Sequence, residues 1–231
     1  MTPLSGSPEH SIPAWMMWHA RAMVLAWGVL LPLGTLVARF FKVLPGQAWP
    51  RVLDHKAWWH AHRTLQWLGV GLMLLGLWLA WGRGGTQGRL AQAHAWLGLA
   101  VCALGLLQIA SGLMRGSKGG PTAAQLRGDH YDMTPWRRAF ERLHKGLGWL
   151  AVLAAVAVLM GGLLLADAPR WMALALSVWW LVLLTGFVTL QRAGRCIDTY
   201  QAIWGPDPAH PGNRLRPIGW GVRRPPSNTR A

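Results

Sequence analysis

Five stretches of this 231-residue chain contain no Asp, Glu, Lys or Arg, and each is long enough, or nearly so, for a membrane-spanning helix. A helix needs about 20 apolar residues to cross the roughly 30 Å hydrocarbon core of a bilayer. A soluble helical bundle would instead carry a charged face along each helix. The pattern therefore predicts an all-α, polytopic membrane helix bundle with five transmembrane helices. The stretches are 22–38, 64–82, 90–114, 146–166 and 171–191.

Most of the predicted helices extend somewhat beyond these stretches. Pro32 is expected to break the first helix because proline cannot donate a backbone hydrogen bond. Residues 1–14 are interpreted as a short external arm and 15–193 as one transmembrane domain. Residues 194–231 are interpreted as a Gly-, Pro- and Arg-rich cytoplasmic tail, too polar to span and too rich in proline for a long helix. The predicted helices are 15–41, 58–82, 90–114, 134–166 and 170–193.

Basic residues are divided unevenly between the two faces of this arrangement. Four of the 23 Lys and Arg residues fall on the side of the N-terminus, and the other 19 fall on the opposite side. Cytoplasmic loops of membrane proteins carry such an excess, so we expect the N-terminus outside and the C-terminus inside. Topology thus accounts for the net charge of +15, and no nucleic-acid partner is expected. The four basic residues on the side of the N-terminus are Arg21, Arg83, Arg89 and Arg170.

Four histidines, His19, His62, His94 and His144, each stand at the beginning of a predicted span. Successive helices run in opposite directions, so His19 and His94 are expected near the outer face and His62 and His144 near the inner face. Two imidazoles facing each other across a bundle core are what a six-coordinate haem iron needs. The pattern predicts two bis-histidine haems b (iron protoporphyrin IX) in a four-helix core, with irons roughly 20 Å apart along the membrane normal.

The alternative is a non-redox membrane protein, such as a small transporter or an assembly factor, whose histidines are interfacial hydrogen-bonding residues. The charge-free stretches contain no acidic residue, which argues against the interpretation as a transporter coupled to protons or cations. His60 competes with His62, and the two point to nearly opposite faces of a helix. His62 is preferred because it lies deeper, with Gln66 one turn below. Gln66 and Gln108 are candidates for bonds to haem propionates or ring edges, or simply between helices.

The basic connection 115–145 leads directly into His144. Haem propionates and many soluble reductants are anionic, so a basic rim beside the inner haem would attract them. Arginine matches a carboxylate with two donors, which favours Arg137, Arg138 and Arg142 for close contact. The simpler interpretation is that these charges only fix the topology of the loop.

Four sequence motifs surround the four histidines. They are HARAMVLAWGVLLPLG from His19, WWHAHRTLQ from Trp58, HAWLG from His94 with LQ at 107–108, and HKGLG from His144. In this order they resemble the cytochrome b561 family, in the variant often fused to a DOMON domain in eukaryotes. The resemblance covers about residues 15–190. It implies the same four ligand helices, paired one with three and two with four. It also implies a transmembrane oxidoreductase, in which an ascorbate- or quinol-like reductant passes electrons to an acceptor such as ferric iron.

The chain also departs from that family. No DOMON-type domain and no sixth helix are expected in these residues, and the resemblance implies no role for 128–135 or for the tail. Within 128–135, His130 and Tyr131 are candidates for proton handling beside the basic rim. A cytochrome b subunit that anchors a partner enzyme is a further alternative. We expect a multi-pass protein of a bacterial inner (cell) membrane. Its expected partners are the lipid bilayer and either small redox molecules or a redox protein, and a homodimer is left open.

Overall fold

The computed structural model describes residues 2–6, 11–83, 88–120, 124–125 and 127–225. Parts of the predicted arm and tail, residues 7–10 and 226–231, lie outside the described residues. The described chain is all-helical, and five of its helices are long and apolar enough to cross a membrane, which confirms the predicted fold class. These spans are Ala14–Phe40, Ala57–Ala80, Arg89–Leu113, Pro135–Leu165 and Arg170–Arg192.

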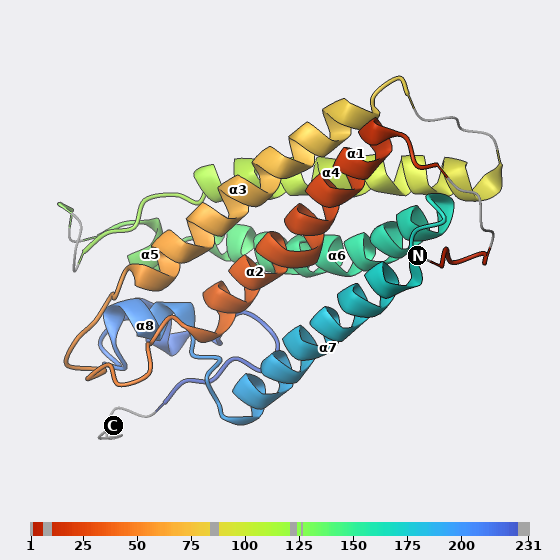
Figure 1. Ribbon diagram of the computed structural model, residues 1–231. Helices are drawn as coiled ribbons and strands as arrows, with labels where there is room; N and C mark the ends of the chain where they lie inside the picture. The colour runs from red at the N-terminus through yellow and green to blue at the C-terminus, as the bar shows by residue number, and fades with distance from the viewer. Residues whose placement is uncertain (1, 7–10, 84–87, 121–123, 126, 226–231) are drawn as a thin grey trace.

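The spans form a bundle in which neighbours pair along their lengths (Figure 1). The first span packs against α3 (Ala57–Ala80), and α4 (Arg89–Leu113) packs against α6 (Pro135–Leu165). By contrast, α7 (Arg170–Arg192) lies at the side of the bundle with Leu176 as its buried residue. Most of its leucines and valines face outward, as expected for a helix in contact with lipid.

The first span is continuous, so the expected break at Pro32 was wrong. It runs from α1 (Ala14–Met23) through a π-helical turn, η1 (Val24–Leu30), into α2 (Leu31–Phe40). Pro32 has no N–H to give to the carbonyl of Gly28, four residues earlier, and a π-helical turn is one way in which a helix absorbs such a defect. The Gly28 carbonyl instead accepts a hydrogen bond of 2.9 Å from the indole of Trp179 on α7.

Small residues bring the helices close together in the middle of the bundle. Gly105 on α4 faces Trp27 and Met73, so a Cβ at that position would lie 3.0 Å from the Met73 sulfur. Trp27 and Met73 belong to a buried core that also contains Ala155 of α6. This core joins the first span, α3, α4 and α6, which are the helices that carry the four candidate histidines.

Residues 195–225, which we call the cap, fold against the end of the bundle opposite to the N-terminus (Figure 1). All six residues of α8 (Thr199–Trp204) are buried. Asp198 caps this helix, and its carboxylate pairs with Arg224 at 2.6 Å. A short 3-10 turn, η2 (Pro211–Arg214), follows. Residues 195–225 of the predicted tail therefore form a folded part of the molecule.

The cap packs on the connection between α4 and α6. A four-residue helix there, α5 (Asp129–Asp132), lies beside α8 and η2. The apolar cluster that joins these parts to α3 consists of Trp58, Met133, Tyr200, Ile203, Trp204 and Ile218. The cap thus closes the bundle at the end where α3 and α6 begin.

Candidate functional site

The outer pair of histidines, His19 on α1 and His94 on α4, faces across the bundle. Their ring centroids are 6.3 Å apart, and the ring planes are nearly perpendicular at 80°. Imidazole–metal bonds of about 2.0 Å, plus about 1.1 Å from each nitrogen to its ring centroid, give a spacing of about 6.2 Å. The gap between the rings therefore fits one metal atom ligated by both.

Three of the four histidines have their Nδ1 atom bonded to a backbone carbonyl of another helix. The distances are 2.8 Å from His19 to Gly76, 2.9 Å from His62 to Gly34 and 3.2 Å from His94 to Val158. A carbonyl oxygen only accepts, so Nδ1 must carry the proton. The Nε2 atom of each ring then has a free lone pair, which is the form that ligates a metal.

The fourth histidine, His144 on α6, has a side chain as its partner. Its Nδ1 lies 2.9 Å from the hydroxyl oxygen of Ser111 on α4. That hydroxyl donates its own proton to the backbone carbonyl of Gln108 at 3.0 Å. The amide of Gln108 is a second partner of the same Nδ1, at 3.0 Å, so His144 is held by two side chains of α4.

The inner pair, His62 and His144, lines a cavity of about 830 Å³ beneath the cap. This volume lies within the range of about 300–1,000 Å³ that is typical of ligand and cofactor sites. His60 is exposed and does not line the cavity, which agrees with the preference for His62. Basic side chains gather along the wall, together with Glu141 as the acidic residue. They are Arg39, Lys42, Arg63, Arg115, Arg137, Arg142 and Lys145.

Both glutamines proposed from the sequence line this cavity, and both also bond between helices. Gln66 on α3 donates to the carbonyl of Leu31 at 3.1 Å. In the orientation that satisfies the Gln108 amide, its nitrogen donates to Nδ1 of His144 at 3.0 Å and to the His144 carbonyl at 3.1 Å, and its oxygen accepts from the Gly148 N–H at 3.2 Å. The two amides therefore stiffen the helix pairs that carry the inner histidines.

Of the three arginines proposed for the rim, Arg142 lines the cavity, and Arg137 and Arg138 are placed differently from each other. Arg137 lines the cavity and is buried, with its Nε 3.0 Å from Glu141 and an Nη 3.3 Å from the carbonyl of Arg115. Arg138 is not among the residues that line the cavity. They stand one position apart on a helix, about 100° around its axis, so the two cannot share one face.

Lys42 is a cavity residue that sequence reasoning missed. It follows the first span, and the cap buries it so that its ammonium donates to the carbonyl of Ile197 at 3.1 Å. Burial, and then the positive charge of Lys145, lowers the pKa of Lys42 to about 8. No local signal marks this lysine, because its burial depends on a segment about 150 residues further along the chain.

The segment 128–135 lies behind the cavity wall. His130 is buried, with its Nε2 3.7 Å from a carboxylate oxygen of Glu141, and burial together with Arg137 lowers its pKa to about 3. Tyr131 packs on Trp204 with ring centroids 5.0 Å apart. Neither residue lines the cavity, so this structure does not bring them to the rim as expected.

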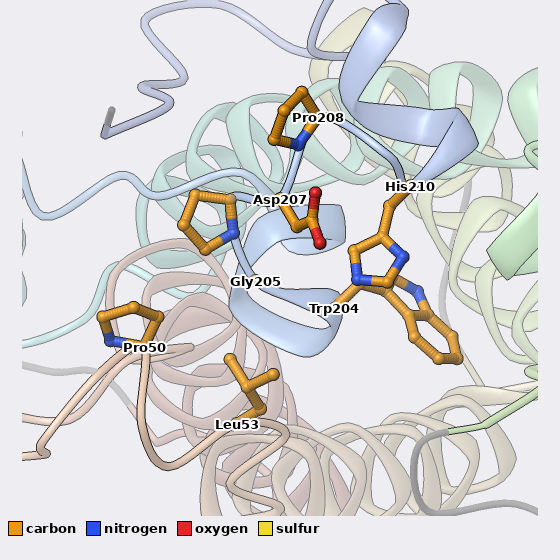
Figure 2. Close-up of a pocket in the computed structure, with 8 residues that line it drawn as sticks. Pro50, Leu53, Trp204, Gly205, Asp207, Pro208 and His210 are labelled. Atoms are coloured by element: carbon orange, nitrogen blue, oxygen red, sulfur yellow. The ribbon is translucent and has the colours of Figure 1, made fainter. Parts of the chain in front are cut away.

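A second, more open pocket lies on the outside of the cap (Figure 2). Its wall combines prolines with Asp207, His210 and the edge of Trp204, but it contains none of the four candidate histidines. Within the described residues, no group of three or more His, Cys, Asp or Glu is placed to hold a metal ion. The candidate metal ligands are therefore the two histidine pairs, each of which offers two imidazoles.

Comparisons with known proteins agree with this arrangement. Ferric-chelate reductase 1 of Homo sapiens is 30% identical over 151 residues, which are 65% of this chain and 22% of that protein. The protein of the same name from Mus musculus is 31% identical over 169 residues, 73% of this chain and 25% of that protein. A cytochrome b561 and DOMON domain-containing protein of Arabidopsis thaliana is 29% identical over 146 residues, 63% of this chain and 27% of that protein.

The chain spans about a quarter of the length of these curated relatives. No family model matches the chain, and no solved structure gives a significant match. These relatives are animal and plant proteins, so they lend no support to the expected bacterial inner membrane. The similarity, together with the five spans, confirms the resemblance seen in the motifs: the chain is similar to ferric-chelate reductase 1 and to cytochrome b561 and DOMON domain-containing proteins, which supports a cytochrome b561-like family of multi-pass membrane proteins.

Proposed function

We propose that this chain is a transmembrane electron-transfer oxidoreductase with two haems b. His19 and His94 would hold the outer haem, and His62 and His144 the inner haem. The observation that carries the proposal is the outer pair, whose centroid spacing of 6.3 Å fits one metal atom while both Nδ1 atoms are bonded to backbone carbonyls. The cytochrome b561 relatives imply haem b binding, and haem iron supplies reversible one-electron chemistry when bound.

The inner site has the chemistry that a haem requires. Its cavity offers apolar walls for a macrocycle, two neutral imidazoles and a row of cations for the propionates. Arg137 is already paired with Glu141, so Arg39, Lys42 and Arg115 are the cations that we assign to an anionic group there. Lys42 has backbone carbonyls as its hydrogen-bond partners, which leaves its charge less compensated than that of Arg137.

The same charge distribution supports one direction of electron flow. A basic rim raises the local concentration of anionic reductants, so we assign an ascorbate- or quinol-like donor to the cap end. Two relatives are named as ferric-chelate reductases, and we therefore assign a ferric chelate as the acceptor to be tested at the opposite end. The chain covers only about a quarter of the length of those two proteins, so the donor and the acceptor are assigned here as proposals.

A haem count with difference spectra tests the proposal. The purified chain should contain two haems b, and dithionite should give the reduced spectrum of six-coordinate haem. His94→Ala should lose the outer haem and retain the inner one, because the two sites share no ligand. His60→Ala is the matched control and should retain both haems, since His60 is exposed. Wild-type protein with fewer than two haems, or His94→Ala with its full content, would refute the assignment.

Vesicles test the transfer itself. Vesicles containing the reconstituted chain should enclose a ferric chelate and receive ascorbate outside. Ferrous iron should accumulate inside in the presence of wild-type chain and should fall to the background rate with His94→Ala. Equal rates for the two would show that electrons do not pass through the outer site.

A further inference from the structure

The inner cavity reaches the outside of the bundle where α3 and α4 adjoin. Its wall includes Trp67 of α3, which is 47% exposed, and Leu113 at the end of α4, which is 70% exposed. In a helix that spans a membrane, exposed apolar side chains such as these face the lipid tails, which are as apolar as leucine. The cavity therefore has a mouth on the lipid side.

Two arginines stand at this mouth and share one aromatic neighbour. Arg63, in the second turn of α3, and Arg115, just after the end of α4, both line the cavity. Their guanidinium carbons lie 5.8 Å and 4.1 Å from the centre of the Trp59 ring. Trp59, Arg63 and Trp67 are spaced four residues apart, so they share one face of α3. The attraction between a cation and an aromatic ring thus holds both positive charges at the mouth.

The positive charge at this mouth is not balanced by acidic side chains. Within the part of the chain that the structure describes, neither Arg63 nor Arg115 forms an ion pair with a carboxylate. Arg137, which donates to the carbonyl of Arg115, is already paired with Glu141. Burial, and then the charges of Arg137 and Arg63, lowers the pKa of Arg115, because like charges repel. An anion between Arg63 and Arg115 would offset that repulsion.

A haem between the inner histidines leaves Arg63 for another anion. Arg63 follows His62 on α3, so it points about 100° around the helix axis from the candidate ligand. Arg63 is exposed, as a residue on the outer side of the mouth should be. Arg39 and Lys42 also line the cavity, and they offer two cations for the two propionates of a haem.

We propose that the mouth between α3 and α4 binds an anionic phospholipid. Its phosphate accepts hydrogen bonds from Arg63 and Arg115, since arginine matches phosphate oxygens with paired donors. Its acyl chains lie along Trp67 and Leu113, which are exposed on the lipid side. Basic pockets between membrane helices are typical sites for anionic lipid headgroups. The site depends on the charges of the protein itself, so it does not rest on the presence of the haems.

Native mass spectrometry of the purified full chain tests this proposal, because it counts bound lipids. In detergent, phosphatidylglycerol should bind more tightly than phosphatidylcholine with the same acyl chains. Arg63→Gln and Arg115→Gln should each weaken the binding of phosphatidylglycerol about fivefold, the contribution expected of one basic residue near a membrane surface. Both variants should bind phosphatidylcholine as the wild type does, which shows that the fold is intact.

Arg142→Gln is the matched control. Arg142 is also exposed and lines the cavity, but it lies seven residues before Trp149, on the face of α6 that meets Phe187 of α7. This variant should bind phosphatidylglycerol as tightly as the wild type. Equal binding of the two lipids by the wild type would overturn the inference, as would an equal loss in Arg142→Gln and Arg63→Gln. Displacement of the lipid by an equal concentration of glycerol phosphate would show a site for soluble phosphates instead. None of these outcomes depends on the haem count.

Discussion

His130 is a residue whose charge is suppressed by its surroundings. It is 1% exposed, and the charged groups around it are Arg137, Lys145, Lys118 and one carboxylate, Glu141. Burial and then Arg137 lower its pKa from 6.5 to about 3. The unfolded chain therefore binds a proton at this position at a higher pH than the folded chain does. The stability that neutral His130 contributes is complete above pH 6.5 and is lost progressively as the pH falls toward 3.

We expect the melting temperature of the detergent-solubilised chain to fall as the pH is lowered from 7 to 4, and His130→Gln to reduce that fall. Glutamine is uncharged at every pH, so it removes the linked proton. Tryptophan fluorescence during heating provides the measurement. His60→Gln replaces an exposed histidine and should keep the wild-type slope. A His130→Gln slope as steep as that of wild type would contradict the assignment.

Among single residues, the sequence predicted those candidates that are marked by their depth in the membrane, and it did not point to residues whose place depends on distant contacts. The four histidines and two glutamines follow from their places in the spans. Ser111 and Lys42 do not, because the partner of Ser111 lies 33 residues away and Lys42 is buried by the cap. Serines in membrane helices often bond within their own helix, so the type alone carries no signal. Arg138 was grouped with Arg137 by charge, although their helical positions separate them.

The first span and α7 are joined by a hydrogen bond that proline makes available. Pro32 cannot use the Gly28 carbonyl, and Trp179 does. Trp179→Phe would remove this hydrogen bond from a carbonyl in apolar surroundings, at a cost of about 1–3 kcal/mol. We expect a lower melting temperature for this variant with unchanged haem content, because α7 carries none of the four candidate ligands.

Trp171→Phe is the control for that element, because Trp171 lies on the same helix and is 52% exposed. It should melt as wild type does. Loss of haem in Trp179→Phe would show that α7 supports the ligand helices directly, contrary to expectation.

Some helices of this chain can be predicted from their own residues alone, and others depend on contacts with distant segments. The five spans were predicted to within a few residues of their observed ends, because a charge-free run of sufficient length is a property of each segment alone. The π-helical turn and α8 were not predicted. A proline in a span indicates a defect but not whether the helix breaks or widens. The six residues of α8 form a helix because the cap buries all of them, which the proline-rich sequence around them does not reveal.

The whole molecule has two unlike ends. At one end the N-terminal residues contact the start of α7, where the N–H of Arg170 donates to the carbonyl of Thr2 at 3.1 Å. At the other end the cap and α5 lie against the bundle (Figure 1). Residues of the cap, among them Cys196 and Trp220, line the inner cavity together with its cations. The sequence predicted which residues share an end, since helix count and direction determine it. It did not predict that the basic end is closed.

The charge split between these ends predicts that the cap faces the cytoplasm, because positively charged loops are retained there during insertion. Single cysteines test this orientation cleanly. Native Cys102 and Cys196 are 5% and 1% exposed and should resist labelling. Thr2 and Arg216 are exposed at opposite ends. In intact cells a membrane-impermeant maleimide should label Thr2→Cys and not Arg216→Cys, and permeabilised cells should show both labelled. Labelling of Arg216→Cys alone in intact cells would invert the molecule. The cation-lined cavity would then face outward, and the donor and acceptor sides proposed above would be exchanged.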